Sequence, residues 1–131
     1  MRYKNVIYMN ANSWLQKGRE FLEEAEHAFN RNRHWFVCFN AHQAAEFFLK
    51  GKLLEKCGSF SFTHDLAVLL RELCACVDID VPKDVLLAAQ FLTPHYIESR
   101  YPGTKGISYD KSLSSNCLEM AKKIIEWSDK L

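Results

Sequence analysis

The sequence predicts an all-α protein, a five-helix up-and-down bundle with a kinked fourth helix. Apolar residues recur at three- and four-residue steps in successive segments, which is the periodicity of helices that turn one face to a core. Turn-forming residues separate these segments, and none of the segments is convincing as a strand. Because the connections are short, neighbouring helices are expected to be antiparallel. With 131 residues, 48% of them hydrophobic, the chain is long enough for one domain with a substantial core.

The N-terminal part predicts an arm followed by the first helix. Residues 1–11 are expected to form a flexible or extended arm, and residues 12–131 the single domain. Asn12 or Ser13 has the side chain to cap the first helix, which should end near Asn30. Only a short turn follows, so the second helix should pack antiparallel to the first.

The second helix, residues 33–57, is predicted to be the centre of the fold. At about 100° per residue, one side of it gathers Val37, Cys38, Ala41, Ala45 and Phe48. Further apolar residues gather on a second side, and a helix that is apolar on nearly all sides is usually buried. Gly58 stands in the usual position beyond the last turn, where it can end the helix.

A polar patch interrupts the second side of this helix. It consists of His42, Gln43, Glu46 and Lys50, within an arc of roughly 100°. One interpretation is a solvated strip in which Glu46 pairs with His42 and Lys50 at helical i,i+4 spacing. In that case the aromatic residues of the same arc would be exposed together, which usually marks an interface. We therefore expect a dimer or partner surface, with the polar patch at its centre, formed by Trp35, Phe36, Phe39, Glu46 and Leu53.

The sequence also predicts where the remaining helices begin and where one of them is kinked. Thr63 is expected to cap the third helix, with Asp65 placed favourably in its first turn. Pro82 suits the first turn of the fourth helix, and Thr93-Pro94 should then kink or restart it. Asp110 is expected to cap the last helix.

Charge and segment composition narrow the function classes. Seventeen basic and sixteen acidic residues give a net charge of +1, so no global basic field points to nucleic acid. The N-terminus lacks the long apolar run of a signal peptide, and no segment is apolar enough to span a bilayer. The expected location is the cytoplasm, with no membrane partner.

The cysteines do not predict a metal site. The chain contains Cys38, Cys57, Cys74, Cys76 and Cys117. An odd count without an export signal predicts reduced, mostly buried thiols. Cys74 and Cys76 point to different sides of a helix, and no second cluster completes a zinc site. No metal and no cofactor is expected.

Three motifs together resemble one family. They are His42-Gln43-Ala44-Ala45-Glu46 followed by Lys50, Thr63-His64-Asp65-Leu66 at the start of the third helix, and Ser99-Arg100-Tyr101-Pro102 after the fourth. Their order and spacing over about residues 12–131 resemble the HEPN domain, named for higher eukaryotes and prokaryotes nucleotide binding. The resemblance implies a helical bundle that usually dimerises. It also implies, for stand-alone members, nucleotide binding and work beside a small nucleotidyltransferase in paired modules of the toxin–antitoxin type.

Other branches of this family are metal-independent ribonucleases, whose motif is an Arg followed after four to six residues by a His. No arginine of this chain has a His at that spacing, and after Arg100 the places hold Lys105, Gly106 and Ile107. The chain also lacks a phosphate-cradling glycine loop. Enzymatic activity is therefore not the first expectation.

The first functional hypothesis is a homodimeric module that recognises a nucleotide, an RNA or a nucleotidyltransferase partner. In it, Lys50 and Arg100 would bind phosphate and Tyr101 would stack on a base. His42, His64 and Asp65 would orient these groups, although His64 could equally be a structural loop contact. Two alternatives remain open from sequence. One is a ribonuclease toxin with a displaced active site that combines His64 or His95 with Arg100. The other is an assembly adaptor without a ligand.

Overall fold

The computed structural model describes residues 10–103 and 106–131 of the chain, all of it helix and loop. The helices in these residues are α2 (Ala11–Asn30), α3 (His34–Cys57), α4 (Leu66–Cys76), α5 (Lys83–Leu92), α6 (His95–Glu98) and α7 (Lys111–Asp129). α5 and the short α6 flank Thr93-Pro94, so together they are the kinked fourth helix of the predicted five-helix pattern. The all-α class is confirmed. The predicted arm lies, except for its last two residues, outside the described part of the chain.

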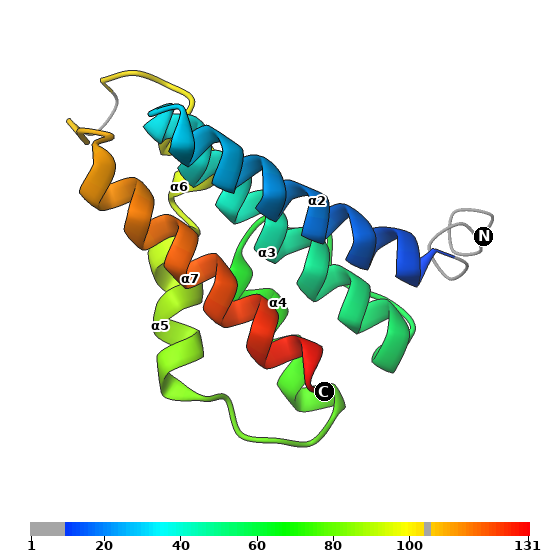
Figure 1. Cartoon of the computed structure of the whole chain (residues 1–131). Coiled ribbons are helices and arrows are strands. Elements are labelled where there is room, and N and C mark those ends of the chain that lie inside the picture. The colour runs from blue at the N-terminus through cyan, green and yellow to red at the C-terminus, as the bar shows by residue number, and fades with distance from the viewer. Residues whose placement is uncertain (1–9, 104–105) are drawn as a thin grey trace.

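The helices are arranged around α3. α2 and α3 lie side by side and antiparallel, with α7 packed across both, while α4 and α5 lie on the far side of the bundle from α2 (Figure 1). α3 contacts α2, α4, α5, α6 and α7. A helix with neighbours on so many sides must be apolar around most of its circumference, which agrees with its sequence.

The predicted inner face of α3 is confirmed. Its residues Val37, Cys38, Ala41, Ala45 and Phe48 are completely buried. The helix ends where predicted, at Gly58, whose φ of 84° is left-handed. The Gly58 N–H donates to the carbonyl oxygens of Leu53 and Leu54, which closes the last turn.

A glycine lets α2 lie very close to α3. A Cβ on Gly18 of α2 would lie 2.9 Å from the backbone nitrogen of Phe48 and 3.1 Å from the carbonyl oxygen of Ala44. Both of these atoms belong to the α3 backbone, which cannot rotate away. The absence of a side chain at Gly18 therefore sets the distance between the two helices.

Two helix starts differ from the prediction. α2 begins slightly earlier in the chain, with Asn10 rather than Asn12 or Ser13 at the cap position. α4 is capped by Asp65, whose side chain accepts hydrogen bonds from the backbone N–H groups of Ala67 and Val68. Thr63 instead accepts from the backbone N–H of Asp65, and so shapes the turn before the cap. The predicted cap of the last helix, Asp110, is confirmed.

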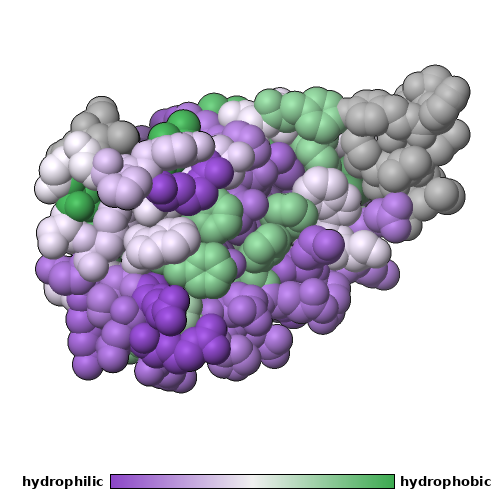
Figure 2. All heavy atoms as spheres, turned by 90° about the horizontal axis from the view of Figure 1, so that it is seen from above, coloured by the Kyte–Doolittle hydropathy of each residue, from purple (hydrophilic) through white to green (hydrophobic). Residues whose placement is uncertain are grey.

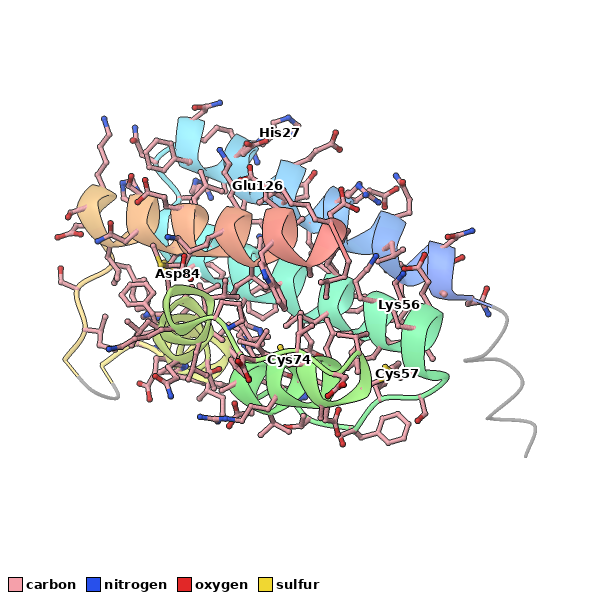
Figure 3. The ribbon with its side chains drawn as sticks, turned by 90° about the horizontal axis from the view of Figure 1, so that it is seen from below. His27, Lys56, Cys57, Cys74, Asp84 and Glu126 are labelled. Carbon is pink, nitrogen blue, oxygen red and sulfur yellow. A yellow bond between two sulfur atoms is a disulfide. The ribbon has the colours of Figure 1, made fainter. Side chains whose placement is uncertain are left out.

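The cysteines differ from the predicted reduced state. Cys38 of α3 is bonded to Cys117 of α7, and Cys57 at the end of α3 is bonded to Cys76 at the end of α4. Cα separations of 5.2 Å and 6.1 Å lie within the usual range for disulfides. Cys74 is unpaired and buried within α4 (Figure 3), and burial raises the pKa of its thiol. The sequence could not predict the pairing, because it joins residues up to 79 positions apart.

No helix of the described residues is long and apolar enough to cross a membrane.

Candidate functional site

The polar patch of α3 is built around the buried carboxylate of Glu46. This residue is 3% exposed, and its Oε2 accepts a hydrogen bond from Lys50 Nζ at 2.8 Å. His64, from the loop before α4, places its Nδ1 2.9 Å and 3.1 Å from the two carboxylate oxygens. Glu46 is therefore buried and paired within the fold, and it is not part of the solvated strip that the helical spacing alone would allow.

His42 fixes the loop that carries His64. It is fully buried, and its Nε2 lies 2.8 Å from the backbone carbonyl oxygen of His64. Since a carbonyl oxygen can only accept, Nε2 carries the proton and donates it. Burial lowers the pKa of His42, although the neighbouring carboxylate of Glu46 opposes this shift. A neutral His42 therefore holds the backbone of His64 while Glu46 holds its side chain.

The exposed side of this group is a stack of aromatic and cationic side chains. The His64 imidazole, whose side chain is 53% exposed, lies 3.9 Å from the ring centroid of Tyr96, at an interplanar angle of 17°. The Arg100 guanidinium lies 4.5 Å from the same Tyr96 centroid, and its Nε donates to the Tyr96 carbonyl oxygen at 2.8 Å. The guanidinium also lies 5.0 Å from the ring of Phe39. Tyr96 thus brings an imidazole and a guanidinium together at the surface.

The kink of the fourth helix positions this stack. Thr93 lies at the kink, and its hydroxyl donates to the carbonyl oxygen of Ala89. The hydroxyl oxygen of Thr93 in turn accepts the backbone N–H of Leu66, the first residue of α4, at 3.0 Å. Because the kink is tied to the start of α4, Tyr96 of α6 lies against His64 in the loop before α4.

The structure brings together most of the residues that the motifs predicted as a binding site. His42, Gln43, Glu46, Lys50 and His64 form one group, in which Gln43 Oε1 lies 3.3 Å from His42 Nδ1. Arg100 joins the group through Tyr96, and Tyr101 lies beyond Arg100, its ring centroid 5.4 Å from the guanidinium.

Two predicted site residues have other contacts. The carboxylate of Asp65 is bonded to the first turn of α4. Lys50 is 5% exposed, with its ammonium between Glu46 and the ring of Phe60. Lys50 is therefore less accessible from solvent than Arg100, which is partly exposed, and His64, which is exposed.

The residues predicted for a dimer face divide into two sets. Trp35 is 47% exposed, and Phe36 and Phe39 are partly exposed. Leu53, at 2% exposure, and Glu46 are in the interior of the bundle. In Figure 2, which looks down on the α2 side of the molecule, hydrophobic side chains gather in the middle of the face and hydrophilic ones border them. Trp35, Phe36 and Phe39 are the predicted interface residues that can reach a second copy.

Sequence reasoning missed Tyr96, although it contacts both His64 and Arg100. One signal could have found it: Tyr96 lies four residues before Arg100, so the two side chains share one face of a continuing helix. The Pro94 before it suggested only a kink.

A cavity of about 390 Å³ opens beside Arg100, between the start of α3 and the chain that follows α6. Trp35, Tyr101 and Tyr109 contribute aromatic side chains to its wall. The Tyr109 hydroxyl lies 2.6 Å from Nδ1 of His95. Burial raises the pKa of Tyr109 to about 12 and lowers that of His95. Both groups are therefore neutral near pH 7, and the hydroxyl donates to the imidazole.

His95 is 6% exposed, so this second histidine considered in the ribonuclease alternative faces the interior. Within the described residues, no three His, Cys, Asp or Glu side chains are grouped so that they could hold a metal ion.

Comparisons with known proteins agree on one family. The model of the HEPN domain matches residues 11–131. The solved structure of TT1696 from Thermus thermophilus has 31% sequence identity and a TM-score of 0.84, and the match covers 92% of this chain and 97% of that one. ST0689, an archaeal HEPN homologue, has 28% identity and a TM-score of 0.74, with 92% and 95% covered.

A third structure, an HEPN domain protein from Thermotoga maritima, has 20% identity and a TM-score of 0.73, with 90% of this chain and 95% of that chain covered. At this identity the likeness supports the fold alone. No curated protein matches the chain.

Proposed function

Because this chain belongs to the HEPN domain family, as its motifs predicted, we propose that it acts as a homodimeric module that binds a nucleotide or RNA through Arg100 and His64. Phosphate is the group that these two side chains suit. A guanidinium can form two parallel hydrogen bonds to a phosphate, and an imidazolium whose Nδ1–H faces Glu46 can donate a third from its Nε2. The ring of Tyr96 holds both side chains by contact with its faces.

One observation carries this proposal: the Tyr96 ring contacts both the half-exposed imidazole of His64 and the guanidinium of Arg100. Holding two flexible polar side chains against one ring costs conformational entropy. The contacts of Glu46 and His42 with His64 order this residue when the chain folds, so its entropy is not lost again when a ligand binds. A preorganised pair of donors binds an anion with less loss of entropy than two mobile ones.

Isothermal titration calorimetry with mononucleotides and a short single-stranded RNA tests the proposal. Each of His64→Ala and Arg100→Ala should weaken binding about tenfold or more, since hydrogen bonds to charged groups contribute about 1.5–3 kcal/mol each. Arg71→Ala, which removes an exposed arginine of α4, is the matched control and should change affinity little. Failure of the parent protein to bind any of these ligands would contradict the proposal.

A second function, metal-independent RNA cleavage, is favoured by the pairing of His64 with Glu46 at 2.9 Å. A histidine oriented by a carboxylate is a common general base. In this step the base would take the proton of a ribose 2′-OH, and the 2′-oxygen would bond to phosphorus. The bond from phosphorus to the 5′-oxygen would break as that oxygen takes a proton from the solvent. Arg100 would stabilise the charge on the phosphorane oxygens. The products would be a 2′,3′-cyclic phosphate and a 5′-hydroxyl.

In this candidate the base comes from the loop before α4 and not from a position following the arginine, which would explain why the family's ribonuclease spacing is missing. Incubating labelled RNA with the protein and a chelator tests it. Cleavage that His64→Ala abolishes would support the candidate, and intact RNA with the parent protein would rule it out.

The proposed setting is a cytoplasmic pair with a small nucleotidyltransferase, as in toxin–antitoxin modules. The HEPN match supports it, since the resemblance to stand-alone members implies such pairing. Where a small nucleotidyltransferase is encoded beside this chain, co-expression of the two followed by size-exclusion chromatography is the direct test. If the nucleotidyltransferase binds while nucleotides and RNA do not, the chain is an assembly adaptor.

A further inference from the structure

We propose that the cavity beside Arg100 receives a single unpaired nucleobase, so that the protein recognises a nucleotide or RNA only where a base is free of a duplex. This inference rests on the proposed function, because the phosphate of that nucleotide would be the one bound at Arg100. It names the base as the part of the ligand that the protein recognises, and it assigns Trp35 to contact with the ligand instead of to the dimer face.

The walls of the cavity have the chemistry that a base requires. Trp35 and Tyr101, from parts of the chain that are distant in sequence, both line it. Their exposed fractions are 47% and 53%, unusually high for large aromatic side chains. Aromatic faces bind bases of any identity by stacking, and each base stacked this way contributes enough to change affinity about tenfold or more.

The size and position of the cavity also fit. Its volume of about 390 Å³ lies in the range of small-molecule sites. Arg100 lines the cavity and at the same time contacts Tyr96, the ring on which His64 stacks. A base in the cavity would therefore have its phosphate within reach of the guanidinium.

A paired base cannot satisfy this geometry. In a duplex both faces of a base are covered by its neighbours, and its hydrogen-bonding edge is occupied by its partner strand. Entry into the cavity would require the base to leave the stack, which costs a few kcal/mol. Single-stranded RNA and free mononucleotides avoid most of this cost.

Fluorescence titration of the full chain tests the inference, with three ligands: a short single-stranded RNA, the same RNA fully paired with its complement, and adenosine monophosphate. Binding of the single strand should quench tryptophan emission, and the duplex should bind at least tenfold more weakly. If adenosine monophosphate quenches as the single strand does, one nucleotide is the recognised unit. If only the RNA quenches, the unit is a base within a strand. Either result supports the inference.

Variants separate the stacking role of Trp35 from a structural one. Trp35→Ala should weaken single-strand binding about tenfold or more, while Trp35→Phe should keep most of the affinity and lose most of the quenching. Leu87→Ala removes another exposed apolar side chain, on α5 and outside the cavity, and should change neither. If Trp35→Ala fails to fold, the Trp35→Phe result alone decides.

Two outcomes would overturn the inference. If the duplex binds as well as the single strand, or if Trp35→Phe keeps the quenching, an unpaired base does not enter this cavity against Trp35, although Arg100 and His64 could still bind phosphate. If no ligand binds the parent protein, the proposed function fails and the inference fails with it.

Discussion

Glu46 is a buried charge whose role depends on its two partners, Lys50 and His64. Removing the carboxylate by Glu46→Ala would leave the ammonium of Lys50, which is 5% exposed, without its ion pair. Breaking a buried pair from one side costs about 3–5 kcal/mol. We therefore expect Glu46→Ala to lower the free energy of unfolding by about that amount, measured by urea denaturation.

A double variant and a surface control make this prediction specific. Glu46→Leu combined with Lys50→Leu should be less destabilised than Glu46→Ala, because both charges leave together. Glu26→Ala breaks the surface pair with Lys122 and should cost less than about 1 kcal/mol. Equal losses in Glu46→Ala and Glu26→Ala would mean that the Glu46–Lys50 pair is solvated in solution.

His42 and His95 predict how stability depends on pH. Burial lowers the pKa of both below the ordinary value of 6.5, so the unfolded chain binds protons at a higher pH than the folded chain. Their contribution to stability is therefore complete above about pH 6.5 and is lost as the pH falls through the folded-state pKa values. Each unit by which a pKa is lowered corresponds to about 1.4 kcal/mol at most.

Urea denaturation between about pH 7.5 and pH 5 measures this loss. His95→Gln should flatten the pH dependence, because one of the two contributing groups is gone. His27, on the outer surface of α2 (Figure 3), is the matched control, and His27→Gln should leave the slope unchanged. A parent protein that becomes more stable as the pH falls over this range would contradict the prediction.

At the scale of elements, the contact between α2 and α3 depends on Gly18. Gly18→Ala favours the helix intrinsically by up to about 1 kcal/mol. The added Cβ would, however, lie 2.9 Å from the Phe48 nitrogen, so the helices must separate. Overpacking of this kind costs about 1–3 kcal/mol. We expect a lower melting temperature for Gly18→Ala and almost no change for Lys17→Ala, which alters an exposed neighbour. A Gly18→Ala protein at least as stable as the parent would show that the backbone of α3 moves to make room for the Cβ.

The two disulfides should differ in their response to reductant. Cys76 is exposed at the end of α4, whereas Cys38 and Cys117 are completely buried. A dithiol can therefore attack the Cys57–Cys76 bond in the folded protein, while the Cys38–Cys117 bond requires unfolding. Native reduction followed by alkylation and mass spectrometry should label Cys57 and Cys76 alone.

The same experiment without reductant is the control. Labelling of Cys57 and Cys76 in the untreated native protein would mean that their thiols are reduced, as the odd cysteine count predicts. Loss of the shorter crosslink, which spans 19 residues, should lower the free energy of unfolding by about 3 kcal/mol.

The helices were predictable from sequence because their signals are local. The periodicity of α3, Gly58 at its end and the Thr93-Pro94 kink all act within one or two turns. The prediction placed the cap of α4 at Thr63, whereas the structure has it at Asp65. Both residue types are good caps, and only the observed backbone shows which of them takes the position.

At the scale of the whole molecule, the candidate site was only partly predictable. The motifs located His42, Glu46, His64 and Arg100, but spacing along the chain does not say which of them are buried. Lys50 pairs inward with Glu46, an ion pair that helical spacing allows equally on a solvated surface. Tyr96 was missed because its importance comes from contact between α6 and the loop before α4, which are separated by α4 and α5.

Self-association is where the whole molecule gives the clearest test. Because Trp35 is assigned to the ligand, the aromatic surface left for a second copy is that of Phe36 and Phe39, which are partly exposed at the N-terminal end of α3. A two-fold axis repeats each contact, so one such patch can close a dimer. Because Leu53 and Glu46 are inside the bundle, the predicted interface is smaller and shifted toward the N-terminal half of α3.

Phe36→Asp is the sharper variant for this test, because an Asp at position 39 would lie beside the Arg100 guanidinium and could form an ion pair there. A carboxylate at position 36 would be unpaired among apolar groups in the dimer, so Phe36→Asp should weaken association strongly. Phe39→Asp should weaken association less, because its carboxylate could pair with Arg100. Leu87→Asp, on the exposed face of α5, should leave the dimer intact. Light scattering over a range of concentrations measures all four proteins. A parent protein that stays monomeric at high concentration, or a Phe36→Asp dimer as tight as the parent, would mean that the two-fold contact uses another face.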